Sequence, residues 1–345
     1  MAAAPTHPIV DVRSPGEHQH AHIPHAYSLP LFTDEERKIV GTAYKQQGKQ
    51  IAIKKGLDFF GVKMKSMVEE AERLIEQHNV ATSKSNTIIV HCWRGGMRSA
   101  GVAWLLDLYG FDVHVLIGGY KAYRNWTLQQ FEQPYQMKVL GGYTGSGKTP
   151  LLQALQTLGE KNIDLEALAH HKGSAFGGIG QPTQPSQEMF ENKLALALYQ
   201  TNLATNEEQP FFWIEDESQR IGKLNIPHAL WKTIRQQPVF FLDIPFEERL
   251  EHILEEYAGL DKEKLCEAVL RIQKRLGPFE TKQTLLCIKE NNLKEAFSLL
   301  LRYYDKTYTK ALHSRDQLNQ LLQNISLASV DSFTNAKKLL SHIKS

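Results

Sequence analysis

Two short stretches of this sequence combine residue types that bind anions and carry out nucleophilic chemistry. In the first, "HCWRGGMRS", five residues separate Cys92 from Arg98. A cysteine reacts as its thiolate, and a loop between a strand and a helix lowers the thiol pKa because N–H groups converge on the sulfur. Gly95 and Gly96 let the backbone curl round an anion, and Arg98 can grip it with two hydrogen bonds. We predict that Cys92 and Arg98 are catalytic, within an anion loop of Trp93, Arg94, Gly95, Gly96 and Met97. The alternative is an inert buried cysteine at a strand end.

The second stretch, "GYTGSGKT", is a complete G-x-x-x-x-G-K-[ST] motif. It follows the apolar run "MKVL" and precedes a helical pattern, which is the context that this motif requires. Its N–H groups can cradle a diphosphate, Lys148 can reach a phosphate oxygen, and the Thr149 hydroxyl can hold Mg²⁺. The predicted diphosphate-binding residues are Gly142, Tyr143, Thr144, Gly145, Ser146, Gly147, Lys148 and Thr149.

Acidic residues that could orient magnesium or water follow a later apolar run. Glu215, Asp216 and Glu217 come directly after "FFWI", where the alternative is a strand end capped in solvent. The segment "IDLEALAHHKGSAFGGIG" could admit a phosphate or a flexible substrate, or it is a mobile surface loop. Its candidate residues are Asp164, Glu166, His171, Lys172 and Ser174.

No metal-ligating residues are predicted from spacing. His18, His20 and His22 alternate, but they lack the cysteine or acidic partners at set spacings that are typical of metal sites.

Bulk properties describe an ordinary globular protein of two domains. The chain has 345 residues, of which 42% are hydrophobic and 23% charged. A net charge of +2 does not indicate nucleic-acid binding, although a local basic face would suffice for it. Three cysteines fit a reducing cytosol rather than a disulfide framework. The sequence has neither a signal-peptide pattern nor an apolar run of membrane-spanning length, so we expect a cytoplasmic protein with no membrane partner.

Alternating strands and helices predict an α/β fold with parallel sheets covered on both faces. We expect strands at 7–13, 87–92 and 112–119, and helices at 63–78, 98–110 and 120–126, in a first domain of residues 1–126. Residues 127–136 are polar, contain Pro134 and are predicted as a linker. The second domain, 137–345, has expected strands at 137–142, 210–218 and 238–245 and a helix at 150–159. It is mostly helical from Phe246 until a last strand–helix pair within 325–344.

The spacing of the cysteine loop fits both phosphatases and rhodanese-type enzymes, and an upstream segment favours the latter. "IVDVRSPGEHQHAHIPHAYSLPL" resembles the opening of a rhodanese domain, with Asp11, Arg13, Glu17 and His22-Ile23-Pro24 at matching places. "LIGGYKAYRNW" resembles the C-terminal rhodanese signature. Ala21 and His25 stand where the family commonly has glycine, which can alter the local turn but removes no catalytic group.

The combination of both domains resembles the tRNA 2-selenouridine synthases over nearly the full length. The matching segments are "DVRSPGE", "EERKIVGTAYKQQGKQIAIKKGL", "HCWRGGMRS", "GGYTGSGKT", "IDLEALAHHKGSAFG" and "WIEDESQRIG". "LDIPFEERL" and "YYDKTY" also stand at the places expected for this family. General sulfurtransferases lack the "VGTAYKQQG" insertion. This resemblance implies an N-terminal rhodanese-like domain and a P-loop domain with a helical C-terminal part.

The resemblance also implies a transferase that replaces the sulfur of wobble 2-thiouridine in tRNA with selenium. Its co-substrates would be selenophosphate and geranyl diphosphate, with Mg²⁺ as a further candidate at the P-loop. S-geranylation would create a better leaving group, and the P-loop would hold the diphosphate of the prenyl donor. Cys92 would then form a perselenide or assist expulsion of the thiol, while Arg98 and the loop amides hold the selenophosphate oxyanion. We expect a monomer whose partners are the tRNA anticodon loop and an enzyme that supplies selenophosphate.

Arg271, Lys274 and Arg275 in "RIQKRLG" lie on about one helical face and are tRNA-binding candidates, with a solvated helix face as the alternative. Three other functions stay open from the residues alone. They are a nucleotide-dependent sulfurtransferase, ATPase or kinase with a rhodanese module, a dual-specificity phosphatase, and a tRNA-binding module without activity.

Overall fold

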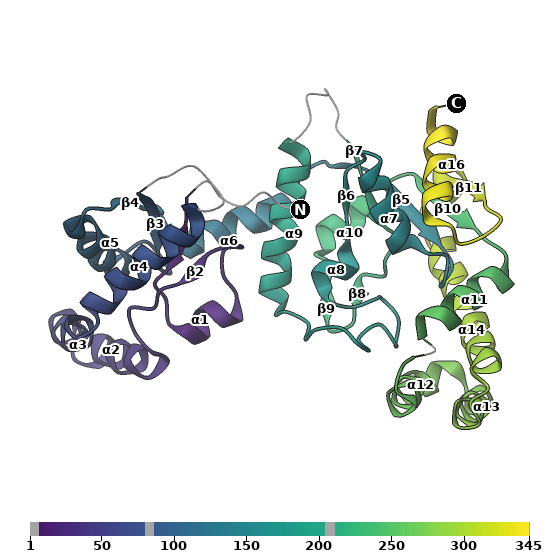
Figure 1. The fold of residues 1–345 in the computed structure, drawn as a ribbon, viewed down its shortest axis with the longest axis horizontal. Helices are drawn as coiled ribbons and strands as arrows, with labels where there is room; N and C mark the ends of the chain where they lie inside the picture. The colour runs from purple at the N-terminus through teal and green to yellow at the C-terminus, as the bar shows by residue number, and fades with distance from the viewer. Residues whose placement is uncertain (1–6, 80–85, 204–210, 258, 345) are drawn as a thin grey trace. The chain divides into compact units, whose positions relative to one another are not determined.

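Parallel strands form the two main sheets of the protein (Figure 1). The computed structural model describes residues 7–79, 86–203, 211–257 and 259–344. The chain divides into two units: residues 1–130 together with 191–196, and residues 131–190 together with 197–345. Residues 1–6, on which the expectation of no signal peptide partly depends, lie outside the described residues.

The sheet of the first unit has the strand order β2-β1-β3-β4. Its strands are β1 (Ile9–Asp11), β2 (Tyr27–Ser28), β3 (Thr87–His91) and β4 (Asp112–Val115), and each adjacent pair is parallel. Val10 lies opposite both Tyr27 and Val90, so β1 and β3 are interior strands. Val10, Ile88 and Val90 are fully buried, as expected for strands that are covered on both faces.

The helices of the first unit are α1 (Pro15–His20), α2 (Asp34–Gln46), α3 (Lys49–Gly61), α4 (Met64–Asn79), α5 (Met97–Tyr109) and α6 (Gly119–Gln130). A capping box between Thr33 and Glu36 starts α2, and Gly110 ends α5 in a left-handed conformation that suits glycine. Helix α6 is longer than the expected 120–126 because Thr127 and Gln130 are buried and continue its packed face. Residues 127–130 of the predicted linker therefore form the last turn of α6, and Gln136 is the first residue of the next strand.

The sheet of the second unit has the order β11-β10-β5-β7-β6. Its strands are β5 (Gln136–Gly142), β6 (Asn162–Ile163), β7 (Phe211–Glu215), β10 (Val239–Asp243) and β11 (Leu322–Ser326), all in parallel pairs. A small antiparallel hairpin, β8 (Arg220–Ile221) and β9 (Leu224–Asn225), stands apart from it. Strand β5 lies between β10 and β7, and the order of the strands reverses around it. Ligands of open α/β sheets bind at the carboxyl end of such a position.

Helices of the second unit are of two kinds. Those that precede β10 or follow β11 along the chain are α7 (Lys148–Thr157), α8 (Leu165–Ala169), α9 (Gln187–Leu203), α10 (His228–Arg235) and α16 (Ser332–Lys344). Residues 191–196 of α9 belong to the first unit. The others form the predicted helical region: α11 (Phe246–Tyr257), α12 (Lys262–Leu276), α13 (Pro278–Lys289), α14 (Leu293–His313) and α15 (Leu318–Leu321). Leu265, Ile288 and Leu300 are buried in a core cluster of the helical region. The expected α/β class with a helical C-terminal part is confirmed.

Among the described residues, no helix combines the length and the apolar character that are needed to cross a membrane.

Candidate functional site

The cysteine loop connects the end of β3 at His91 to the start of α5 at Met97. Cys92 is 3% exposed, and its Sγ lies 3.3 Å from the hydroxyl of Ser99 in the first turns of α5. The Ser99 hydroxyl also lies 3.0 Å from the carbonyl oxygen of Gly96. A hydroxyl has one proton, so it can donate to the sulfur or to the carbonyl but not to both. Donation to the sulfur is the stronger bond once the thiol is ionised.

Hydrogen bonds favour the thiolate of Cys92. Burial raises the pKa of the thiol, but the Ser99 hydroxyl and the N–H groups of Ser99, Arg94 and Gly96 outweigh that effect. The pKa of Cys92 therefore lies below its ordinary value. Three backbone N–H groups that point at one sulfur are also the arrangement that binds an oxyanion next to it.

A close approach between two segments gives the cysteine loop its shape. A Cβ atom on Gly119 would lie 2.4 Å from the carbonyl oxygen of Cys92 and 2.6 Å from the nitrogen of Gly95. Gly119 also has a φ of 57°, so a larger residue would be both strained and obstructed. This explains why α6 begins at a glycine.

The rim of the cysteine loop is exposed. Trp93 is 39% and Met97 53% exposed, and Arg94 and Gly96 are also exposed. Solvent-exposed residues thus surround the buried Cys92.

Arg98 is held by a carboxylate beside the loop. Its Nη1 donates to Oε2 of Glu17 at 2.9 Å, and Arg37 of α2 donates to the same oxygen at 2.7 Å. Burial raises the pKa of Glu17, but Arg98, the Ser14 N–H and Arg37 together lower it from 4.5 to about 2. Glu17 is therefore charged near neutral pH and holds two guanidinium groups near the loop. Arg37 and Ser99 were missed in the sequence, although both belong to segments that matched the family.

Replacing Ser99 with alanine should raise the pKa of Cys92. A hydrogen bond to a charged group contributes about 1.5–3 kcal/mol, which corresponds to about 1 to 2 pH units. Because the wild-type pKa is lowered, its thiolate persists to lower pH, and the variant should need a higher pH for the same rate of alkylation. The measurement is iodoacetamide modification of the Cys92 peptide against pH, with Ser66→Ala on α4 as a control. Coincident profiles for Ser99→Ala and wild type would contradict the role of Ser99.

The predicted phosphate loop lies between β5, which ends at Gly142, and α7, which begins at Lys148. The Lys148 ammonium donates to the carbonyl oxygen of Gly142 at 3.3 Å and so folds back over the loop. Ser146 is 1% exposed and its hydroxyl has no partner among the described residues. The whole predicted diphosphate motif thus lies at the carboxyl end of the central strand, where α7 begins.

Residues that are far from the phosphate loop in the sequence form hydrogen bonds with its backbone or with each other. These residues were not identified from the sequence. Arg249 of α11 is 3% exposed and donates to the carbonyl oxygen of Thr144 at 3.0 Å. Asp305 of α14 accepts two hydrogen bonds from the same guanidinium, at 2.9 and 2.8 Å. The hydroxyl of Tyr308 accepts a bond from the Gly142 N–H at 3.2 Å. Their only signal was the presence of "LDIPFEERL" and "YYDKTY" among the family-like segments.

Three carboxylates meet next to Thr149. Its hydroxyl lies 3.0 Å from Oε2 of Glu166 and 2.8 Å from Oε1 of Glu215. Ligand atoms of Glu166, Glu215 and Glu217 all lie within 4.8 Å of one another. Glu215 is fully buried, and its Oε2 has no hydrogen-bond partner among the described residues. A single hydroxyl proton cannot satisfy two ionised carboxylates, so a proton or a cation must be shared here.

Burial and the charges of neighbouring carboxylates raise the pKa values of the carboxyl groups in this cluster. Burial raises the pKa of Glu166, although Lys148 and Thr149 oppose this effect. Burial and the charge of Glu166 raise the pKa of Glu215 well above its usual range. Burial and Glu166 also raise the pKa of Glu217 to about 8. Burial raises the pKa of Asp164, which caps α8 by accepting the Ala167 N–H at 2.8 Å.

Asp216 is not part of the carboxylate cluster. Its side chain accepts a hydrogen bond from Tyr308 at 2.6 Å and forms an ion pair with Arg315, whose side chain is 1% exposed. Tyr308 also contacts Gly142, so Asp216 belongs to the support of the phosphate loop.

The small-residue loop after α8 passes directly over the carboxylates. Gly173 has a φ of 66°, which favours glycine, and a Cβ atom there would lie 2.7 Å from a carboxylate oxygen of Glu217 and 2.9 Å from one of Glu166. Lys172 pairs with Glu256, and the Ser174 hydroxyl accepts the Phe176 N–H at 3.2 Å.

His171 lies on the same loop, and burial and then the charge of Arg271 lower its pKa. The positive charge of Arg271 therefore acts on the imidazole of His171 in this loop. Arg271, Lys274 and Arg275 are exposed on α12, and the last two are in its final turn.

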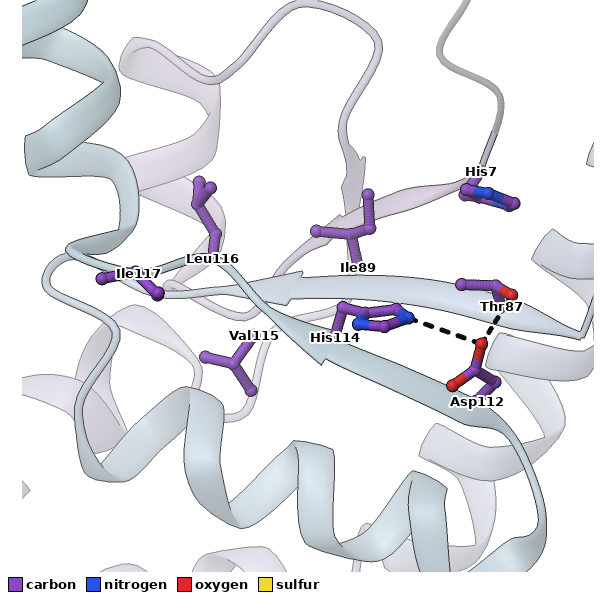
Figure 2. Close-up of a pocket in the computed structure, with 8 residues that line it drawn as sticks. All are labelled: His7, Thr87, Ile89, Asp112, His114, Val115, Leu116 and Ile117. Atoms are coloured by element: carbon purple, nitrogen blue, oxygen red, sulfur yellow. Dashed lines mark hydrogen bonds and ion pairs between the residues drawn. The ribbon is translucent and has the colours of Figure 1, made fainter.

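A shallow cavity of about 540 Å³ in the first unit contains none of the predicted site residues. It lies along the edge strand β4, where Asp112 accepts a hydrogen bond from Thr87 at 2.9 Å and pairs with His114 at 3.4 Å (Figure 2). Its lining consists of His7, Thr87, Ile89, Asp112, His114, Val115, Leu116 and Ile117. With its polar groups paired to each other, it offers little for a specific ligand.

A reactive-type cysteine loop on one parallel sheet and a P-loop on another define a protein with a rhodanese-like domain and an AAA-type P-loop domain. Comparison with protein families agrees with this class. Residues 1–125 match the rhodanese-like domain, and residues 135–338 match the family described as the tRNA 2-selenouridine synthase AAA domain.

The chain belongs to the tRNA 2-selenouridine synthase family. It is 36% identical over 334 residues to a tRNA 2-selenouridine synthase of Sulfurovum sp., and 35% identical over 337 residues to one of Pseudomonas syringae pv. tomato. Each of these two alignments covers 87% of this chain and 87% of the relative. A relative of the same name from Nitrosomonas europaea is 39% identical over 258 residues, which are 72% of this chain and 63% of that relative.

Proposed function

We propose that this protein replaces the sulfur of wobble 2-thiouridine in tRNA with selenium from selenophosphate, by way of an S-geranyl intermediate. The names of its relatives support the overall reaction. The observation that carries the two-step route is that one chain contains both a thiolate-stabilising loop and a complete diphosphate loop. The cysteine loop would bind the selenophosphate that is used in one step, and the diphosphate loop would hold the diphosphate that is released in the other.

In the first step, the sulfur of the base attacks C1 of geranyl diphosphate. The C–O bond breaks, diphosphate leaves, and the base loses its N3 proton. The N–H groups of the P-loop and the Lys148 ammonium would stabilise the charge that builds up on the diphosphate. Arg249 and Tyr308 would keep the loop in its binding shape through Thr144 and Gly142.

The carboxylates next to Thr149 fit a hard divalent cation such as Mg²⁺. Hard cations prefer oxygen ligands, and Glu215 offers a buried carboxylate oxygen with no partner among the described residues. Thr149, Glu166, Glu215 and Glu217 would hold the cation, which would neutralise diphosphate charge. Without a cation, the ionised carboxylates would repel each other and the diphosphate, and burial together with this mutual repulsion raises the pKa values of Glu215 and Glu217.

Replacing Glu215 with glutamine should weaken cation binding by about tenfold or more, because it removes one charged ligand from a buried site. Electron paramagnetic resonance of Mn²⁺, titrated into the protein without tRNA or donors, measures this directly. Glu188→Gln on α9 is the control that removes a carboxylate of the second unit outside the cluster. Equal Mn²⁺ affinity in wild type and Glu215→Gln would exclude Glu215 as a ligand.

In the second step, we assign Cys92 to the expulsion of geranylthiol. Its thiolate would add at C2 of the base, the bond from C2 to the geranyl sulfur would break, and the departing thiolate would take a proton. Selenium would then attack C2 and release Cys92, and water would cleave the P–Se bond to give phosphate. A perselenide on Cys92 is disfavoured because attack of a thiolate on selenium would leave phosphorus reduced to phosphite.

Arg98 and the loop N–H groups would hold the phosphoryl oxygens of selenophosphate, which is supported by their positions beside the Cys92 thiol. Arg98 would exchange one of its contacts with Glu17 for the anion, or would bind it with the guanidinium N–H groups that Glu17 does not occupy.

The test is mass spectrometry of nucleosides from 2-thiouridine-containing tRNA after incubation with the full chain and both donors. Selenouridine and free geranylthiol are the expected products. An unchanged tRNA would overturn the proposal, and release of phosphate from ATP or from an aryl phosphate would then point to an ATPase or a phosphatase.

A further inference from the structure

The α2–α3 hairpin exposes most of its side chains. Helices α2 and α3 lie side by side in the first unit (Figure 1). Ala43 is the buried residue of α2, and α3 buries Ala52, Gly56 and Phe60. A helix with so little buried surface contributes little to a core, so its side chains are available for another molecule.

The middle of the hairpin is positively charged, whereas its acidic side chains, Asp34, Glu35, Glu36 and Asp58, lie toward its two ends. From residue 37 to residue 57 the chain has six cationic side chains and no aspartate or glutamate. Arg37 is paired with Glu17. The other five have no ion pair in the part of the chain that the structure describes, and they are Lys38, Lys45, Lys49, Lys54 and Lys55. Lys38 and Lys45, seven residues apart, share one face of α2. Helices α2 and α3 together have six cationic and four acidic side chains, and the cationic ones lie together between residues 37 and 57.

Apolar side chains are interspersed among these lysines. Tyr44 is 52%, Ile51 43% and Leu57 58% exposed. They do not form one stripe: Ile51 and Ile53 are two residues apart in α3 and therefore point to nearly opposite sides. A helix that lies in a membrane surface needs a continuous apolar face, and this hairpin lacks one.

We propose that the α2–α3 hairpin binds the phosphate backbone of the tRNA substrate, an inference that rests on the proposed function. Unpaired lysines without intervening carboxylates complement a polyanion, and such contacts supply most of the affinity of proteins for nucleic acids. Tyr44 offers a ring on which an unpaired base can stack.

The hairpin is also connected to the cysteine loop. Arg37 of α2 and Arg98 of the loop bind the same oxygen of Glu17, at 2.7 and 2.9 Å. An RNA backbone on the hairpin would therefore lie next to the loop that contains Cys92, with the exposed Trp93 at its rim. The hairpin would bring the modified base of the tRNA toward Cys92.

The experiment compares tRNA binding by the full chain and a triple variant, Lys45→Ala, Lys49→Ala and Lys54→Ala. Fluorescence anisotropy with labelled 2-thiouridine tRNA is measured from about 50 to 200 mM salt. Each lysine on a phosphate contributes about one to the slope of log K against log salt, so the slope should fall by about three and the affinity by about 10- to 100-fold. A second triple variant, Lys232→Ala, Lys282→Ala and Lys289→Ala, removes the same charge from exposed positions on α10 and α13 and should bind like wild type.

The outcomes separate this inference from the proposed function. If wild type does not bind tRNA, the proposed function fails. If wild type binds tRNA and the hairpin variant binds equally well with an unchanged slope, the hairpin inference fails alone. Vesicles of equal parts phosphatidylcholine and phosphatidylserine are a further arm, and binding to them but not to tRNA through these lysines would also overturn it. Melting temperatures and circular dichroism establish that both variants are folded.

Discussion

Replacing Cys92 with serine should stop selenium transfer and leave geranylated tRNA behind. The serine hydroxyl is far less acidic than the thiol, so the hydrogen bonds that stabilise a thiolate at Cys92 cannot produce an equivalent nucleophile. Loss of a catalytic nucleophile costs about 10³-fold or more in rate. Nucleoside mass spectrometry with both donors should therefore show S-geranyl-2-thiouridine in place of selenouridine.

Two controls accompany this variant. Cys266→Ser changes a half-buried cysteine of the helical region and should retain selenouridine formation. A Cys92→Ser protein that makes selenouridine at the wild-type rate would show that the rhodanese-like domain does not use this thiol. One that makes neither product would place Cys92 before the geranyl step, in conflict with the proposed division of labour.

Replacing Lys148 with alanine should stop geranylation while selenium transfer continues on tRNA that is already geranylated. The ammonium lies over the phosphate loop, 3.3 Å from the Gly142 carbonyl oxygen, and would neutralise charge on the leaving diphosphate. Removing one preorganised donor to a developing anion costs about 10²- to 10³-fold. The rate of S-geranyl-2-thiouridine formation from geranyl diphosphate measures this loss.

The matched control for Lys148→Ala is Lys282→Ala, which removes an exposed lysine of α13. Chemically geranylated tRNA provides the second arm, because it bypasses the diphosphate step. If Lys148→Ala fails on that substrate as well, the P-loop has a function beyond geranylation, or the variant is misfolded, which its melting temperature would reveal.

The local parts of both candidate sites were predictable because each is a continuous segment. The cysteine loop starts after β3 and ends at α5, and the P-loop starts at the end of β5 and ends at α7, as the motif and its flanking apolar runs indicate. Strand, loop and helix follow one another directly, over residues 87–109 in the first case and 136–157 in the second, so spacing alone orders them.

The contacts between distant segments could not be predicted from spacing. Glu166 and Glu215 meet at Thr149 because β7 lies next to β5, with Glu215 opposite Leu140. The sequence of β7 does not indicate which strand it pairs with. For the same reason Asp216 and Glu217, adjacent in sequence, were grouped together, whereas successive residues at a strand end point to opposite sides and here take different partners.

The helical hairpin α2–α3 was part of a family-like segment but had no predicted structure. Its exposed isoleucines and lysines are spread around both helices, so the periodic apolar stripe that identifies a core-facing helix is weak there. Residues 127–130 were assigned to a linker for a similar reason, since Thr127 and Gln130 are polar although the fold buries them in α6.

The measurement that tests the central claim most directly is the omission of geranyl diphosphate. Wild-type protein is incubated with 2-thiouridine-containing tRNA and selenophosphate, with and without the prenyl donor, and the nucleosides are followed by mass spectrometry over time. The account predicts selenouridine only when geranyl diphosphate is present, preceded by a transient S-geranyl nucleoside. Selenouridine formed at the same rate without geranyl diphosphate would contradict the two-step division between the P-loop and the cysteine loop.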